Sequence, residues 1–340
     1  MIEKKVNEIL IDGSVPPKSC NMHGVDSIEI NSFNNHLFKN EVIENYIEQM
    51  KCKENIKVLT ISFGVTLSNL EILKHFQNLE KFFIHSETVL SFQGLSHLKS
   101  LKRLDVDTEK NKKRSLEELA CTSTLESMGV EFGNLGDYEA IRKCTSLTGV
   151  CIGRGPAPDF NLWHKVPLDG GLKFWNYCSF SELKDMAYLP SLSEVMIGAC
   201  QKFRCFKGDN SNIKTLRIDG SKYFDISSLE TCPSIEKLWI GGSIPILPLD
   251  DFPEMENVKI IEMPDIKIDF GRNELEQKMP NLKTFYFSRG GTKDELINLS
   301  KNNKNVLICK TGKGYMDGVQ VYNKYEWLQE HGWYSFTDST

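Results

Sequence analysis

A short phrase of alternating apolar and polar positions recurs along most of the chain. Its form is apolar-x-x-apolar-x-apolar, as in IKVLTI from Ile56, LKRLDV from Leu101 and IEKLWI from Ile235. Further copies begin at Leu79, Leu125, Leu147, Leu172, Leu192, Ile213, Val258, Leu282 and, in degenerate form, Val306. Neighbouring copies start 20 to 25 residues apart. Since alternate side chains of a strand point to opposite faces, each phrase predicts a β-strand with one buried face.

The segments between the phrases follow a different rhythm. Apolar residues there stand three apart, as in Leu67, Leu70 and Leu73, and again in Ile226, Leu229 and Cys232. A period of three predicts short 3₁₀ or single-turn helices with one buried edge. These returns are too short for the crossover helices of βαβ domains. One such unit cannot bury its apolar edge alone, so the pattern predicts stacked repeats that share one continuous core.

These residues resemble the leucine-rich-repeat superfamily, and in particular its short bacterial class, like the internalin repeats. The segment DISSLETCPSIEKLWI, from Asp225 to Ile240, is among the closest matches. The resemblance implies an α/β solenoid, a leucine-rich-repeat horseshoe with a parallel concave sheet and 3₁₀ or short helices on its convex side. The family usually places Asn beyond the last strand hydrophobe, where it forms a ladder. Here such positions hold Glu87, Cys200 and Ser221, so no asparagine ladder is expected there.

The pattern divides the chain into three parts. Residues 56–311 form the repeats, about 11–12 coils. Residues 1–55 form an N-terminal cap, with strands at Ile2–Ile11 and Val25–Ile30 and a helix over residues 39–53. Residues 312–340 form a C-terminal cap, in which YMDGVQV predicts a hairpin and a short helix from Tyr322 carries Trp327 and Trp333. Two coils, 153–171 and 244–257, are rich in Pro or Gly and predict irregular returns.

Composition narrows the class of partner and the compartment. The formal net charge is −5, so the chain has no basic excess for binding nucleic acid. No stretch approaches the roughly 20 apolar residues of a membrane span, and the start MIEKKVNEILIDG lacks the apolar core of a signal peptide. The ten cysteines form no CxxC pair, which favours reduced, buried thiols. These features predict a cytoplasmic protein that is monomeric when unbound.

The outward-facing residues of the concave sheet are the predicted binding surface. About eleven strands at 4.8 Å spacing present a face on the order of 50 Å long. We expect Phe83, Met196, Trp239 and Tyr286 to be large and exposed on it, and Trp, Tyr and Arg dominate interface energetics. The alternative is that the sheet or a cap covers these aromatic residues. The predicted partner-binding residues are Phe83, His85, Arg103, Asp105, Asp107, Phe174, Asn176, Met196, Arg217, Asp219, Trp239, Glu262 and Tyr286.

Within this surface, the leading centre comprises Met196, Arg217, Asp219, Trp239, Glu262 and Tyr286. In the N-terminal half, His85, Asp107 and Glu131 share one column on three successive coils. Such a row has the residue types of a metal site. Strand spacing and the nearby Lys81 and Arg103 favour instead an acidic stripe that recognises a basic partner surface.

The sequence therefore favours a protein-binding module that uses its concave face. A toxin-neutralising bacterial immunity protein is the favoured specific form, because a capped, free-standing repeat protein resembles that type. The alternative is a secreted or surface adhesin like the internalins, and an enzyme using the His85, Asp107 and Glu131 row ranks third. No catalytic or nucleotide-binding motif is visible, so no catalytic residue, metal or cofactor is predicted.

Overall fold

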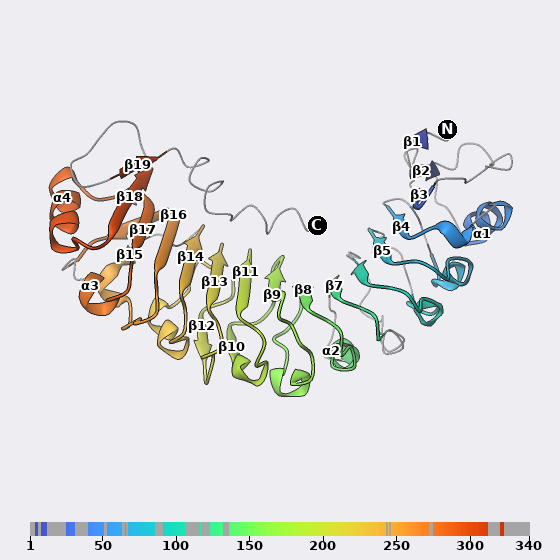
Figure 1. Cartoon of the computed structure of the whole chain (residues 1–340), viewed down its shortest axis with the longest axis horizontal. Helices are drawn as coiled ribbons and strands as arrows, with labels where there is room; N and C mark the ends of the chain where they lie inside the picture. Colours follow the sequence, from blue (N-terminus) through green and yellow to red (C-terminus); the bar gives the residue numbers. More distant parts are fainter. Residues whose placement is uncertain are drawn as a thin grey trace. The chain divides into compact units, whose positions relative to one another are not determined.

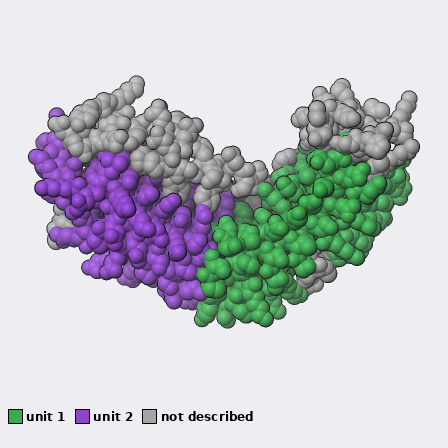
Figure 2. All heavy atoms as spheres, viewed as in Figure 1, with its two compact units in different colours: residues 1–172, 188–191 green, residues 173–187, 192–340 purple. Residues whose placement is uncertain are grey.

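A computed structural model describes residues 4–5, 8–11, 25–30, 40–50, 53–62, 65, 67–85, 91–106, 116, 123–131, 136–242, 244, 246–271, 275–311 and 320–322. The chain forms two compact units (Figure 2). Unit 1 comprises residues 1–172 and 188–191, and unit 2 comprises residues 173–187 and 192–340.

The core of unit 1 lies behind a sheet of parallel strands, one strand per repeat (Figure 1). In order of pairing they are β2 (Glu8–Ile11), β3 (Ser27–Ile30), β4 (Val58–Ile61), β5 (Lys81–Ile84), β6 (Arg103–Val106), β7 (Ser127–Glu131) and β8 (Gly149–Gly153). β1 (Lys4–Lys5) pairs antiparallel with β2. The returns contain α1 (Asn40–Gln49), η1 (Lys53–Asn55), η2 (Glu71–His75), η3 (Leu95–His97), α2 (Gly136–Ile141) and η5 (Phe160–Trp163).

Unit 2 repeats this plan, and its β16 and β17 are longer than the described strands of unit 1. Its parallel sheet pairs β11 (Glu194–Gly198), β13 (Thr215–Asp219), β14 (Lys237–Gly241), β16 (Ile260–Asp269), β17 (Thr284–Gly290), β18 (Leu307–Thr311) and β19 (Gln320–Tyr322). β15 (Leu247–Pro248) adds to β16. The returns contain η7 (Ile226–Thr231), η8 (Leu249–Asp251), α3 (Leu275–Lys278) and α4 (Lys293–Asn302). β9 (Gly171–Trp175) and η6 (Met186–Tyr188) lie where the chain passes between the units.

The predicted alternation of inward and outward side chains is confirmed. In β4, Leu59 and Ile61 are fully buried, whereas Val58 and Thr60, which alternate with them, are only half-buried. The three-residue rhythm of the returns is also present as 3₁₀ helices, for example η2 with Leu70, Leu73 and Phe76 buried. The fold class predicted from the repeats, a leucine-rich-repeat solenoid with a parallel sheet, is therefore correct.

Two returns of unit 2 differ from the predicted helical form. β10 (Glu182–Lys184) and β12 (Cys205–Lys207) pair as a small parallel sheet on the return side. The residues around them are aromatic, and aromatic side chains favour extended backbone. Phe174, Phe180, Phe203, Phe206 and Phe224 form a chain of ring contacts with centroids 4.9–6.1 Å apart. This aromatic spine fills the core of unit 2 behind β9, β11 and β13.

The irregular coils contain more order than their Pro and Gly content predicts. Within residues 153–171, the Asp159 side chain accepts a hydrogen bond from the Asn161 N–H and starts the 3₁₀ helix η5. Trp163 of this helix is fully buried, and its indole N–H donates to the Tyr138 carbonyl. Within residues 244–257, the extended segment β15 is followed by the single turn η8.

The copy of the phrase that begins at Leu172 is displaced from its predicted register. Here Leu172 and Phe174 are the buried strand residues, equivalent to Leu59 and Ile61 of β4. The shift makes the repeat more regular, because the inward residues Val150, Leu172 and Val195 are then 22 and 23 residues apart. Gly171, at φ +105°, permits the early turn into this strand.

The N-terminal strands extend the repeat pattern, and the structure describes only a short part of the C-terminal segment. β2 pairs parallel with β3, and β3 pairs parallel with β4, so the N-terminal strands continue the repeat sheet. The predicted helix is present as α1, with Ile43, Ile47 and Met50 buried. At the C-terminus, β19 pairs parallel to β18. The predicted DG turn and the segment with Trp327 and Trp333 lie outside the described residues.

A ladder of short polar side chains links successive coils, at a place the sequence analysis missed. The residue before the first apolar position of a phrase donates a hydrogen bond to a backbone carbonyl about one repeat earlier. Examples are Asn78 to Glu54 (2.9 Å), Ser146 to Ser123 (2.7 Å), Asn257 to Pro233 (3.0 Å) and Asn281 to Glu256 (2.8 Å). At the position where the family has its ladder, the Ser221 hydroxyl donates to the Cys200 carbonyl at 3.2 Å. The bond from Ser221 is buried, whereas the other four are exposed at the turns.

Candidate binding face

The outward row of unit 1 has the register predicted from the sequence. Thr60, Phe83, Asp105, Gly129 and Cys151 are direct partners on β4 to β8. All five are half-buried. These residues are thus partly accessible on the face of the sheet opposite the returns, which we call the strand face. The row gives unit 1 a continuous accessible surface across five strands.

Three residues of this face are fixed against one another. The Arg103 guanidinium carbon lies 5.2 Å from the centroid of the Phe83 ring. Its Nε donates to Asp105 Oδ2 at 2.7 Å, with 24% and 26% of the two side chains exposed. Gly129 lies beside the Asp105 carboxylate, and a Cβ there would overlap Oδ1. The ring contact and the ion pair therefore hold Arg103 in one orientation at the surface.

The predicted row of His85, Asp107 and Glu131 is only partly described. His85 follows β5, is half-buried, and its backbone N–H donates to the Ile61 carbonyl at 2.7 Å. Asp107 and the side chain of Glu131 lie outside the described residues. The acidic recognition role of this row, and the alternative that the row binds a metal ion, therefore stay predictions.

A different metal-ligating group comes together on the return side of unit 1. It comprises Glu44, Glu48 and His75, and its ligand atoms all lie within 4.8 Å of one another. The sequence analysis missed it. Glu44 and Glu48 are one helical turn apart in α1, which the amphipathic pattern could have suggested, but nothing local links them to His75 in the next return.

In unit 2 the predicted register is correct and the predicted exposure is wrong. Met196, Arg217, Trp239, Glu262 and Tyr286 are direct partners across β11, β13, β14, β16 and β17. However, Met196 is 3% exposed, Trp239 is 6% exposed, and Glu262 and Tyr286 are fully buried. The alternative that these side chains are covered is therefore the correct one.

Neighbouring side chains account for part of this burial. The Trp239 indole lies against Gly241 of its own strand, and the Arg217 guanidinium carbon is 4.3 Å from its ring centroid. Tyr286 packs with Cys309 of the next strand. Strands about 4.8 Å apart place large residues of one row in direct contact, so these residues bury one another.

Two charged side chains in and beside this row, Arg217 and Asp219, remain partly accessible. Arg217 Nη2 lies 4.0 Å from Asp219 Oδ2, with 15% and 33% of the two side chains exposed. Burial lowers the pKa of Arg217, while Asp219 and Glu262 oppose the shift. Burial, aided by Glu262, raises the pKa of Cys309 to about 12. Arg217 thus faces two carboxylates and an aromatic ring on the strand face of unit 2.

The displaced register of β9 corrects two further site residues. Phe174 was expected on the surface, but it is fully buried and contacts Phe180. Asn176 was expected in the strand, but it lies in the turn after β9 with φ +57°. The outward residues of this coil are Lys173 and Trp175, with the Lys173 Nζ 4.9 Å from the Trp175 ring centroid. They occupy the place on the strand face that was assigned to Phe174 and Asn176.

No protein-family model matches the chain, and no curated protein matches it. Among solved structures, a chain of the Drosophila Toll–Spatzle complex has a TM-score of 0.52 and 11% identity, covering 95% of this chain and 51% of that one. This chain thus spans about half its length. An internalin of Listeria monocytogenes has a TM-score of 0.48 and 11% identity, covering 92% and 88%. A Leptospira interrogans leucine-rich-repeat protein has 0.41 and 14%, covering 84% of each chain. The likeness to the Toll complex shows the leucine-rich-repeat fold.

Proposed function

We propose that this leucine-rich-repeat solenoid is a binding module that recognises another protein through its strand face, centred on Phe83, Arg103 and Asp105. The carrying observation is the fixed, half-exposed arrangement of these three side chains. Aromatic and arginine side chains contribute most to interface energies, and a side chain already held in place loses less entropy on binding. The Toll chain that shares this fold was captured with Spatzle, which supports a protein partner.

The accessible charges of unit 2 extend the proposal. Arg217 and Asp219 offer a cation and an anion on the strand face of that unit. The Trp239 ring holds the Arg217 guanidinium, and the buried Trp239, Glu262 and Tyr286 do not themselves contact the partner in this proposal. Complementary charge would set the partner's orientation and its rate of association.

The specific form we favour is a cytoplasmic immunity protein that neutralises a toxin and is monomeric when unbound. The cytoplasmic compartment in this proposal rests on the composition of the chain, with its mild charge and ten cysteines without a CxxC pair. The second candidate is a surface adhesin like the internalins, favoured by the likeness of the repeats to that class. Labelling of intact cells would distinguish the two, because only an adhesin is accessible from outside.

The test of the binding face uses substitutions at its centre. We expect Phe83→Ala and Arg103→Ala each to weaken binding to the protein encoded by the neighbouring gene by about 2 kcal/mol, roughly 30-fold. Gln77→Ala, at an exposed turn outside the strand face, is the matched control and should bind like wild type. Binding would be measured by titration calorimetry, with circular dichroism to check the fold.

The outcomes separate the face from the biological role. Wild-type affinity in both face variants would place the binding surface elsewhere. Failure of the wild-type chain to bind its neighbour and to protect cells from it would exclude that immunity role.

A further inference from the structure

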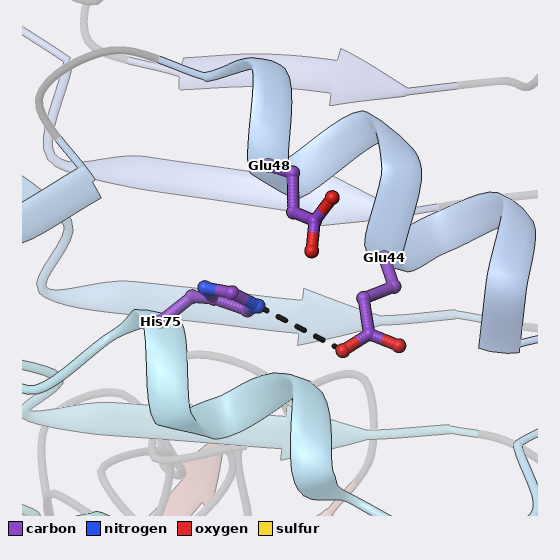
Figure 3. Close-up of side chains that lie close together, drawn as sticks. All are labelled: Glu44, Glu48 and His75. Carbon is purple, nitrogen blue, oxygen red and sulfur yellow. Dashed lines mark ion pairs between the residues drawn. The ribbon is translucent and has the colours of Figure 1, made fainter.

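Three potential metal ligands converge between the return that follows β3 and the return that follows β4 (Figure 3). Glu44 and Glu48 extend from successive turns of α1, and His75 lies at the end of η2, which packs against that helix. One ligand atom from each residue can be chosen so that all three lie within 4.8 Å of one another. Glu44 and His75 are half-buried and Glu48 is exposed, so the group is open to solvent on one side.

The His75 imidazole has a nitrogen with no hydrogen bond in this group. Its Nε2 is buried and has no hydrogen-bond partner, and only 17% of the side chain is exposed, so water has little access to this nitrogen. The closest carboxylate oxygen, Glu44 Oε1, is 3.9 Å away, which is too long for a hydrogen bond. Leaving a buried ring nitrogen unsatisfied costs free energy, and a metal ion would supply the missing partner.

We propose that Glu44, Glu48 and His75 bind one divalent metal ion of the zinc class. One imidazole nitrogen and two carboxylate oxygens form a mixed set that suits Zn²⁺, with water as the fourth ligand. Ca²⁺ and Mg²⁺ fit less well, because they prefer six or more oxygen ligands. A tetrahedral zinc site needs ligand atoms about 3.3–3.5 Å apart, so distances within the group must shorten by up to about 1.4 Å. The glutamate side chains have rotatable bonds that allow this.

Charged side chains surround two of the ligands. Burial, together with Lys53 and Lys74, lowers the pKa of His75 against the opposing effect of Glu44 and Glu48. The hydrogen bond from Lys74 lowers the pKa of Glu44, so this carboxyl group is ionised.

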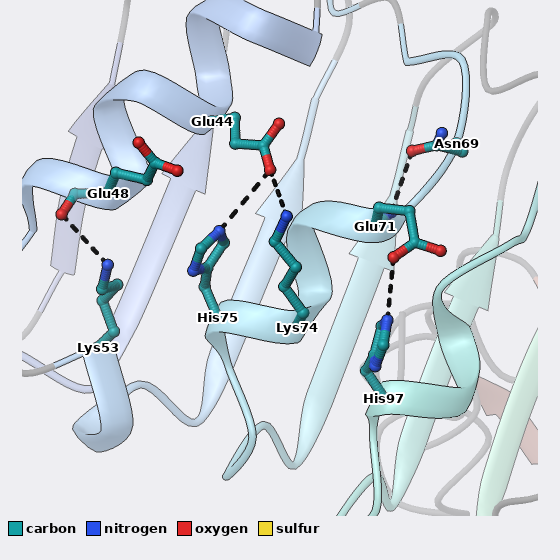
Figure 4. Close-up of polar contacts among 8 residues, drawn as sticks. All are labelled: Glu44, Glu48, Lys53, Asn69, Glu71, Lys74, His75 and His97. Atoms are coloured by element: carbon teal, nitrogen blue, oxygen red, sulfur yellow. Dashed lines mark hydrogen bonds and ion pairs between the residues drawn. The ribbon is translucent and has the colours of Figure 1, made fainter.

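Lys74 would compete with a metal ion for the Glu44 carboxylate (Figure 4). Its Nζ lies 2.5 Å from Glu44 Oε1, and 44% of the side chain is exposed. Lys53 instead donates to the Glu48 backbone carbonyl at 3.3 Å, so the Glu48 carboxylate is not its hydrogen-bond acceptor. An arriving ion must displace the Lys74 ammonium, which can turn into solvent. The bound ion would then join α1 to η2 in place of the Lys74–Glu44 ion pair.

Titration calorimetry of the full-length protein, treated with EDTA and dialysed, tests the site with Zn²⁺. We expect one ion per chain, and at least tenfold weaker binding in His75→Ala and in Glu44→Gln. His97→Ala is the matched control, because His97 holds the equivalent place in η3 and pairs with Glu71 at 3.0 Å. It should bind Zn²⁺ like wild type. Lys74→Ala should bind several-fold more tightly, because its ammonium no longer competes.

A cobalt spectrum distinguishes this site from the cysteines. Co²⁺ bound to thiolate gives a strong near-ultraviolet charge-transfer band, and Co²⁺ bound to nitrogen and oxygen does not. Circular dichroism and His75→Gln, which preserves polarity and bulk, control for loss of fold. Wild-type zinc affinity in a folded His75 variant, a thiolate band in the wild-type spectrum, or unchanged or weaker binding in Lys74→Ala would each overturn the proposal.

Discussion

Two tryptophans of unit 2 lie flat on the strand face because glycine stands beneath each indole ring. A Cβ added to Gly198 would overlap the Trp175 ring, and one added to Gly241 would overlap the Trp239 ring. Cations cover the two rings, with Lys173 Nζ at 4.9 Å and Arg217 Cζ at 4.3 Å from the centroids. Because these two glycines have no side chain, each indole ring has room to lie flat beneath its cation.

This packing makes Gly198 intolerant of the smallest side chain. We expect Gly198→Ala to lower the free energy of unfolding by about 1–3 kcal/mol, because the added methyl group must displace the Trp175 ring. Gly149→Ala, in β8, is the control, since its Cβ would meet nothing within 4 Å. Urea unfolding followed by fluorescence measures both. Equal stability of the two variants would contradict the packing described for Trp175.

Among the elements, the short polar links between coils fix the spacing of the returns. Asn210 is fully buried and bonds three successive coils. Its Oδ1 accepts from the Met186 N–H at 3.2 Å, and its Nδ2 donates to the Lys207 carbonyl and to Thr231 Oγ1. Asn303 has a similar role near α4, where its Oδ1 accepts from the Glu276 N–H at 3.0 Å. Asparagine fits because one side chain carries both a donor and an acceptor.

The contribution of each of these hydrogen-bonded links to the free energy of unfolding depends on how deeply the link is buried. We expect Asn210→Ala to cost about 2 kcal/mol or more, because it leaves the buried Met186 N–H without its acceptor. Asn281→Ala should cost under about 1 kcal/mol, because Asn281 is exposed and water can replace its bond to the Glu256 carbonyl. Urea unfolding of both variants would show the difference. A larger cost at Asn281 would contradict this order.

At the scale of the whole molecule, five of the cysteines that the structure describes are buried, and they serve as small apolar residues of the core. Cys144, Cys232 and Cys309 are at most 1% exposed. Burial raises the pKa of Cys144 to about 11 and that of Cys232 and Cys309 to about 12. Since only the thiolate reacts, these three side chains are protected both by low access and by low ionisation.

Alkylation of the cysteines therefore reports unfolding in each unit. At pH 8 a thiol of pKa 12 is ionised to about one part in ten thousand. We expect iodoacetamide to modify half-buried Cys205 in the folded protein, and Cys144, Cys232 and Cys309 at least 100-fold more slowly than in urea. Peptide mass spectrometry measures the rates. Rapid labelling of any of the three in the folded protein would show that its coil opens locally.

The sequence by itself determined the repeat, its fold class and the register of nearly every strand. Inward residues such as Leu59, Ile61 and Ile240 are dictated by a two-residue alternation that needs no knowledge of distant contacts. The same alternation identified the outward rows, from Thr60 to Cys151 and from Met196 to Tyr286. It failed at the strand that begins near Leu172, where the predicted register uses Leu172, Trp175 and Tyr177. Packing of Phe174 against the aromatic spine selects the other register, with Leu172 and Phe174 buried.

Tertiary structure alone decided which outward residues remain accessible and which side chains meet across coils. Trp239 and Tyr286 have the same alternation as Phe83, yet they are buried, since burial depends on glycines and partners in adjacent strands. Glu44, Glu48 and His75 likewise come together only because α1 packs on η2. Periodicity fixes the face of the sheet on which a side chain lies, whereas its neighbours on that face come from residues some 20 or more positions away in the chain.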